Sequence, residues 1–158
     1  MSSSVPVLAN AYQELRPKIL QRLLDMRSSL DPSLGRVDER TARVPLDAVL
    51  DHLGNFIATG DFGLHRAFLH TFLAMRAAAD QSPAQVLNML VTIGDTAAQV
   101  AQQEGAGTAG SAELTLLMTR VTASTARAVN DLIAEEIANR RSQWHDLNKR
   151  GRTERVPS

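Results

Sequence analysis

The chain has no cysteine, few aromatic residues, no excess charge of either sign and no long apolar run. Without cysteine it forms neither disulfides nor thiolate zinc sites, which fits a reducing cytoplasm. Acidic and basic residues balance at 17 each, so no overall charge attracts nucleic acid or a membrane surface. No apolar run approaches the roughly 20 residues of a transmembrane helix, and the first residues, MSSSVPVLAN, do not resemble a signal peptide. We therefore expect a soluble cytoplasmic protein with neither nucleic acid nor membrane as a partner.

The apolar residues are mainly alanine, leucine and valine, which favour helices. In the first segment they recur every three or four residues, as on one helix face, at Leu8, Tyr12, Leu15, Ile19, Leu23, Met26 and Leu30. Pro17 inside this pattern predicts a kink or a fresh helix start. No stretch alternates with the period of two that marks a strand. The fold class predicted is all-α.

Start and stop signals place two further helices in the middle of the chain. One is expected to begin near Pro45, because proline is favoured in the first helical turn, and to stop at Gly60. Asp61 then has the side chain of an N-cap for a helix reaching about Ala79. His52 lies at the edge of the apolar face of the first of these helices, as a boundary residue.

The last two helices have the clearest signals. Ser82, Pro83 and Gln85 combine an N-cap serine, a first-turn proline and a capping-box glutamine. The helix that follows keeps only a narrow polar strip and should be the most buried. A glycine-containing linker covers residues 103–111, and a final helix is expected from Ser111 to about Leu147. We expect one domain over residues 1–147, followed by a polar, disordered tail over 148–158.

The segment FGLHRAFLHTFLAM at 62–75 contains two histidines on different sides of the predicted helix. His65 falls near the middle of an apolar arc, whereas His70 falls opposite it with Arg66. The two therefore cannot bind one metal ion from this helix. The arc is formed by Leu64, Phe68, Leu69, Phe72, Leu73 and Met75.

His65 is interpreted as a core histidine that donates a hydrogen bond to a carbonyl or side chain. It is also the candidate ligand if the protein binds haem, because a lone histidine among phenylalanines can be a proximal ligand. We expect no cofactor and no metal. No nucleophile elbow, phosphate-binding loop or dinucleotide fingerprint occurs, so no catalytic residue is assigned and the protein is expected not to be an enzyme.

The final helix carries an apolar stripe beyond the part that fills a core. From Ser111 to Leu147 it would be about 55 Å long, more than a domain this small can cover. A projecting tryptophan on an apolar stripe indicates an interface. The sequence thus predicts a homodimer contact through Ile133, Ile137, Trp144 and Leu147.

The order of segments resembles the N-terminal sensor domains of the RsbR and RsbRD stressosome proteins. The similar segments are ILQRLLDMRSSLDPSL, PLDAVLDHLGNFIATGD, LHRAFLHTFLAMRAAADQ and SPAQVLNMLVTIGDTAAQV, followed by a long exit helix, and together they cover about residues 19–137. The resemblance implies a globin-like helical bundle of about five helices that lacks haem, dimerises and passes a signal along its exit helices. An output domain usually follows that helix in this family, and none is found in this sequence.

The function expected from these observations is that of a non-enzymatic regulatory or sensor domain. It would act by dimerising and by contacting another signalling protein. Two alternatives remain open: a sensor that binds haem or another apolar small molecule near His65 and Phe72, and a helical scaffold or adaptor that senses nothing.

Overall fold

A computed structural model describes residues 4–105 and 107–154. Within these ranges the chain forms seven helices and no strand, so the all-α class is confirmed. Five helices are long, and two are single turns. They are α1 (Ser4–Asp25), α2 (Arg27–Leu30), α3 (Pro32–Gly35), α4 (Glu39–Thr59), α5 (Phe62–Ala78), α6 (Pro83–Glu104) and α7 (Ser111–Glu154).

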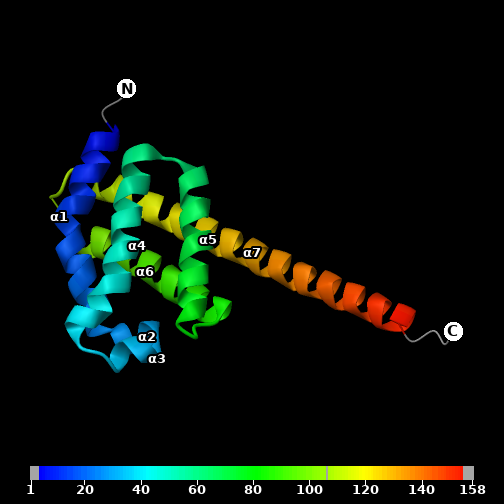
Figure 1. The fold of residues 1–158 in the computed structure, drawn as a ribbon. Coiled ribbons are helices and arrows are strands. Elements are labelled where there is room, and N and C mark those ends of the chain that lie inside the picture. The colour runs from blue at the N-terminus through cyan, green and yellow to red at the C-terminus, as the bar shows by residue number, and fades with distance from the viewer. Residues whose placement is uncertain (1–3, 106, 155–158) are drawn as a thin grey trace.

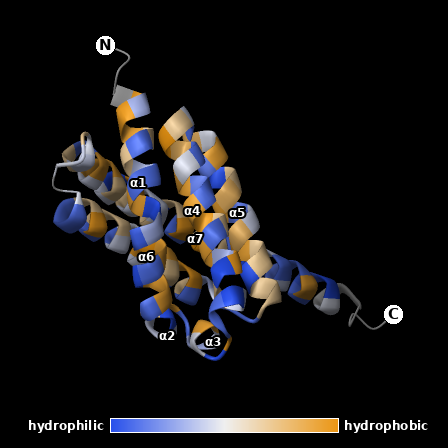
Figure 2. Ribbon diagram, turned by 90° about the vertical axis from the view of Figure 1, so that its left-hand side faces the viewer, coloured by the Kyte–Doolittle hydropathy of each residue, from blue (hydrophilic) through white to orange (hydrophobic). Residues whose placement is uncertain are grey.

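The long helices pack around one core. α1 lies against α4 and α6, and α6 packs along the first half of α7. In Figure 1 the second half of α7 leaves the bundle beside α5 and extends far beyond it. Figure 2 shows hydrophobic and hydrophilic residues interspersed along the bundle helices, while the projecting part of α7 is mainly hydrophilic with a few hydrophobic residues. α6 is lined with buried residues from Val86 to Ala101, as its narrow polar strip predicted.

The capping signals in the sequence are confirmed. Gly60 ends α4 with a positive φ of 65°, which glycine adopts without steric cost. The carboxylate of Asp61 accepts hydrogen bonds from the backbone N–H groups of Gly63 and Leu64 at the start of α5. At the start of α6, Ser82 and Gln85 form both hydrogen bonds of a capping box.

The helix start expected near Pro45 is wrong, and so is the fresh helix start that was one of the two alternatives at Pro17. α4 begins at Glu39 rather than near Pro45, because the Asp38 carboxylate caps it by accepting a hydrogen bond from the Thr41 N–H at 2.8 Å. Pro45 lies inside α4, and Pro17 lies inside α1, which is one helix. The remaining backbone hydrogen bonds and the buried faces of these helices thus outweigh the loss of one donor at each proline.

The end of α7 also differs from the prediction. The helix begins at Ser111 and continues past Leu147 to Glu154, a total of 44 residues, or about 66 Å at 1.5 Å per residue. Residues 148–154 are therefore helical instead of a disordered tail, and residues 155–158 lie outside the described part. No proline occurs between Pro83 and Pro157, so nothing interrupts the hydrogen-bond ladder. Among the described helices, none is both long and apolar enough to cross a membrane.

Candidate functional site

α5 buries a narrower face than its sequence predicts. His65, Leu69 and Phe72 are buried, but Leu64 and Met75 are 58% and 63% exposed. Their placement on the inward arc is therefore wrong. The reason is that α5 lies at the edge of the bundle, where its neighbours cover only part of its circumference. His70 is exposed, as predicted.

His65 is buried, with 4% of its surface exposed, as its central position on the arc predicted. Its Nε2 lies 2.9 Å from the hydroxyl oxygen of Thr125 on α7. Its Nδ1 lies 2.7 Å from Nε2 of His52 on α4. The structure thus joins three helices through a histidine pair, in which His65 is buried and His52 is half-buried.

The sequence interpretation missed this pair because it compared His65 with His70 on the same helix. His52 and His65 lie on consecutive helices joined by the short turn at Gly60 and Asp61. Both were assigned to or near the apolar face of their helix. Two core-side histidines on either side of a tight helix–helix turn are the signal that could have revealed the contact.

The hydrogen bonds around the pair have a fixed direction. The Thr125 hydroxyl donates to the Val121 carbonyl at 2.8 Å, so its oxygen is free only to accept. His65 must then carry its proton on Nε2 and donate to Thr125. Its Nδ1 is left as an acceptor, which requires His52 to donate from Nε2. A single ordered chain of hydrogen bonds therefore runs from α4 through α5 into α7.

The rings around the pair are apolar and stacked. The His52 ring lies over the Phe68 ring at a centroid distance of 3.9 Å, and the two histidine rings are nearly parallel at 5.0 Å. Phe56 approaches His65 at 5.3 Å. These aromatic neighbours hold the rings in place and exclude water from one side of the pair.

Burial and, as the smaller cause, the charge of His65 lower the pKa of His52 to about 4. Burial also lowers the pKa of His65. Both effects arise because an apolar environment disfavours the charged imidazolium. The histidine pair is therefore neutral at pH 7, in agreement with the directed hydrogen bonds.

The space beside the histidine pair is too small for haem. The cavity has a volume of about 20 Å³, which is room for one water molecule. Both nitrogens of His65 are already hydrogen-bonded, so neither is free to bind iron. In the described residues no cluster of three or more histidine, aspartate or glutamate side chains could hold a metal ion.

A larger hollow, of about 300 Å³, lies elsewhere, between the start of α1 and the loop that leads into α7. It is far from the histidines in sequence, and its side chains form no catalytic arrangement. Its lining residues are Val7, Asn10, Ala11, Glu14, Gly107, Thr108 and Ala109.

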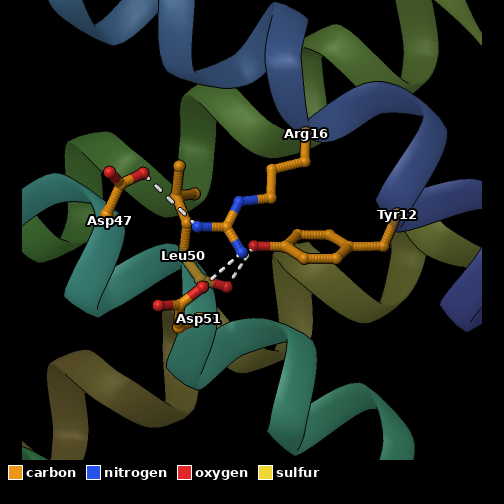
Figure 3. Close-up of polar contacts among 5 residues, drawn as sticks. All are labelled: Tyr12, Arg16, Asp47, Leu50 and Asp51. Carbon is orange, nitrogen blue, oxygen red and sulfur yellow. Dashed lines mark hydrogen bonds and ion pairs between the residues drawn. The ribbon is translucent and has the colours of Figure 1, made fainter. Parts of the chain in front are cut away.

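A second polar cluster joins α1 to α4 (Figure 3). The hydroxyl of buried Tyr12 donates to the Leu50 carbonyl, and burial raises the pKa of Tyr12, so the phenol stays protonated. Arg16 pairs with Asp51 and, at 3.4 Å, with Asp47. Each of these contacts joins a side chain of α1 to a residue of α4. We therefore assign this cluster to the packing of α1 on α4.

The projecting half of α7 carries several exposed apolar side chains. We define the α7 seam as Ile133, Ile137, Trp144 and Leu147. Ile133 is half-buried against the bundle, whereas the other three are 47%, 65% and 64% exposed. All side chains over residues 134–150 are exposed, so the described chain leaves the seam largely uncovered beyond Ile133.

Comparison with known proteins finds no matching family, no similar curated protein and no similar solved structure.

Proposed function

We propose that the protein is a non-enzymatic regulatory module of the kind implied by its resemblance to RsbR-type sensor domains, with a globin-like bundle. Two copies pair through the α7 seam, and a change in the bundle is passed along α7 to another signalling protein. The observation that carries this proposal is a long helix that leaves the bundle with its apolar residues uncovered.

The spacing of the seam supports pairing with another helix. Its residues follow one another at intervals of four, seven and three. These are the a and d core positions of a coiled coil, which alternate at intervals of three and four, with one position omitted. At 100° per residue they lie within about 80° of one another around α7. The position between Ile137 and Trp144 is occupied by Arg140, whose guanidinium pairs with Glu136 of its own helix at 2.6 Å. The seam is thus narrow and broken once by a charge.

The seam does not simply continue the stripe that fills the core. The buried residues of the first half of α7 centre on Met118, Val121 and Thr125, and the seam is turned from them by about a quarter of the circumference. A second copy can therefore approach the seam from the side of the bundle. Two-fold self-association is the commonest way in which proteins cover such a surface.

The apolar area involved is consistent with a dimer of moderate affinity. If pairing removes roughly 300 Å² of apolar surface per subunit, the gain is about 15 kcal/mol per dimer at ~25 cal/mol per Å². Association costs of about 4–15 kcal/mol oppose it. The net free energy is small enough that dissociation should be visible on dilution.

Sedimentation or light scattering across a range of concentrations tests the proposal. We expect a dimer for the wild type and a shift to monomer for Ile137→Glu and for Trp144→Ala, with the helical circular dichroism of the bundle retained. Both residues are exposed, so neither substitution opens a cavity in the core.

Leu116→Glu is the matched control. Leu116 is 52% exposed on α7 and lies on the outer side of the helix, within the bundle and away from the seam. This variant should remain dimeric. A wild type that stays monomeric at high concentration, or an equal effect of Leu116→Glu and Ile137→Glu, would refute pairing through the seam.

A further inference from the structure

We propose that His52 and His65 form a proton-binding site that holds α5 against α4 and α7, and that protonation at mildly acidic pH releases α5 from the bundle. This inference goes beyond the pairing of α7 and does not depend on it. It rests on the position of the pair, on the direction of its hydrogen bonds and on the weak attachment of α5.

α5 depends on few other buried side chains. Only His65, Leu69 and Phe72 are buried on it, whereas α6 buries residues along most of its length. Phe62, Leu64 and Met75 remain largely exposed. A helix with few buried apolar contacts is among the first to open locally. Phe68 and Leu73 add only partly buried contacts with the core, so the histidine pair contributes substantially to holding α5 in place.

The pair has no charged neighbour that would compensate a proton. The side chains around the cavity are apolar or carry only a hydroxyl on all four helices. They are Val49 and Leu53 from α4, Phe68 and Leu69 from α5, Leu90, Ile93 and Gly94 from α6, and Val121, Thr122 and Thr125 from α7. The nearest charges along the chain, Asp51 and Arg66, are directed to Arg16 and Glu135 at the surface.

Adding a proton to His52 is unfavourable, and adding one to Nδ1 of His65 is incompatible with the present hydrogen bonds. A proton on the free nitrogen of His52 leaves the chain intact but places an imidazolium beside Phe68 in an apolar setting. A proton on Nδ1 of His65 points at the proton that His52 already donates. Either the His52 tautomer must change or the contact must open. Release of α5 gives both rings access to water.

Thr125 connects this site to the point where α7 leaves the bundle. Beyond it, the described α7 side chains that still touch the core end at Ile133, and α5 makes one further contact there, between Arg66 and Glu135 at 3.2 Å. Release of α5 therefore removes the contacts that Thr125 and Glu135 of α7 make with α5 near the point where α7 projects.

The pH dependence has a definite sign. A histidine whose pKa is about 4 when docked and 6.5 when released stabilises the docked state fully above pH 6.5, and that stability is lost as the pH falls toward 4. At pH 5 such a group raises the population of released α5 roughly 20-fold relative to pH 7.

Hydrogen exchange on the full chain, with rates corrected for the intrinsic effect of pH, tests the proposal. Between pH 7 and 5 we expect protection of the α5 amides to fall by at least about tenfold, while α6 keeps its protection. In the His52→Gln/His65→Gln double variant this acid effect on α5 should vanish. The exposed His70→Gln variant is the control and should behave as the wild type.

The acid effect on α5 is distinguished from any effect of dimerisation by repeating the hydrogen-exchange measurement in the Ile137→Glu variant. The same acid effect there shows that the proton site acts within one chain, whether or not the α7 seam pairs copies. An acid effect that disappears in Ile137→Glu would overturn the inference.

Nitrogen NMR of labelled histidines supplies a test that does not depend on folding of the double variant. At pH 7, His65 and His52 should each carry the proton on Nε2, and the pair should titrate well below pH 6.5. An ordinary titration near pH 6.5 for both residues would overturn the proposal. So would an equal loss of protection in all helices, or an acid effect that persists in the double variant.

Discussion

Replacement of Gly94 by alanine tests a close contact between α6 and α7. Gly94 lies on α6 where this helix crosses α7, and a Cβ atom built there would lie 2.0 Å from the hydroxyl oxygen of Thr122 and 3.1 Å from its Cβ. That hydroxyl donates to the Met118 carbonyl at 2.7 Å. Rotation of Thr122 would break this hydrogen bond and still leave the short Cβ contact, so α6 and α7 must move apart.

The expected cost exceeds the intrinsic gain of alanine in a helix. Gly→Ala inside a helix stabilises by about 1 kcal/mol when space is available. Forcing an extra methyl group into a packed interface costs about 1–3 kcal/mol and sometimes more. Because the added Cβ would overlap the Thr122 side chain of the facing helix, we expect Gly94→Ala to lower the free energy of unfolding by about 2 kcal/mol.

Urea denaturation followed by circular dichroism measures this change. Gly151→Ala is the matched control, because a Cβ at Gly151 on α7 meets nothing within 4 Å; it should be neutral or slightly stabilising. Adding Thr122→Ala to Gly94→Ala should recover most of the loss, since contacting residues couple in a double-mutant cycle. If Gly94→Ala alone stabilised the protein like an ordinary helix substitution, the described crossing of α6 and α7 would be wrong.

Two smaller predictions concern single side chains. Tyr12→Phe should lower the free energy of unfolding by about 1 kcal/mol, because it removes a buried hydrogen bond to the Leu50 carbonyl; urea denaturation without a measurable change would contradict that bond. His70→Ala should change stability by less than about 0.5 kcal/mol, because His70 is exposed on α5. A large loss on thermal melting of this variant would mean that the rotation of α5 is wrong.

Local signals in the sequence predicted the boundaries that depend on a few neighbouring residues. Gly60, Asp61 and Ser82 occupy the caps that their side chains or backbone freedom favour, because a cap is satisfied within three or four residues of the chain. The burial of His65 followed from helical periodicity alone. The start of α4 was missed because Pro45 gave a stronger apparent signal than Asp38, although a helix tolerates the proline when its other residues are buried.

The sequence by itself thus determined the all-α class, most caps and the centre of the inward face of α5 at His65. Only the tertiary structure decided which groups meet: the pairing of His52 with His65, the hydrogen bond to Thr125, and the exposure of Leu64 and Met75 at the edge of the bundle. Periodicity fixes the direction of a side chain around its own helix axis. It does not fix the rotation and distance between two helices, and these set whether two inward side chains lie 2.7 Å apart or have no neighbour at all.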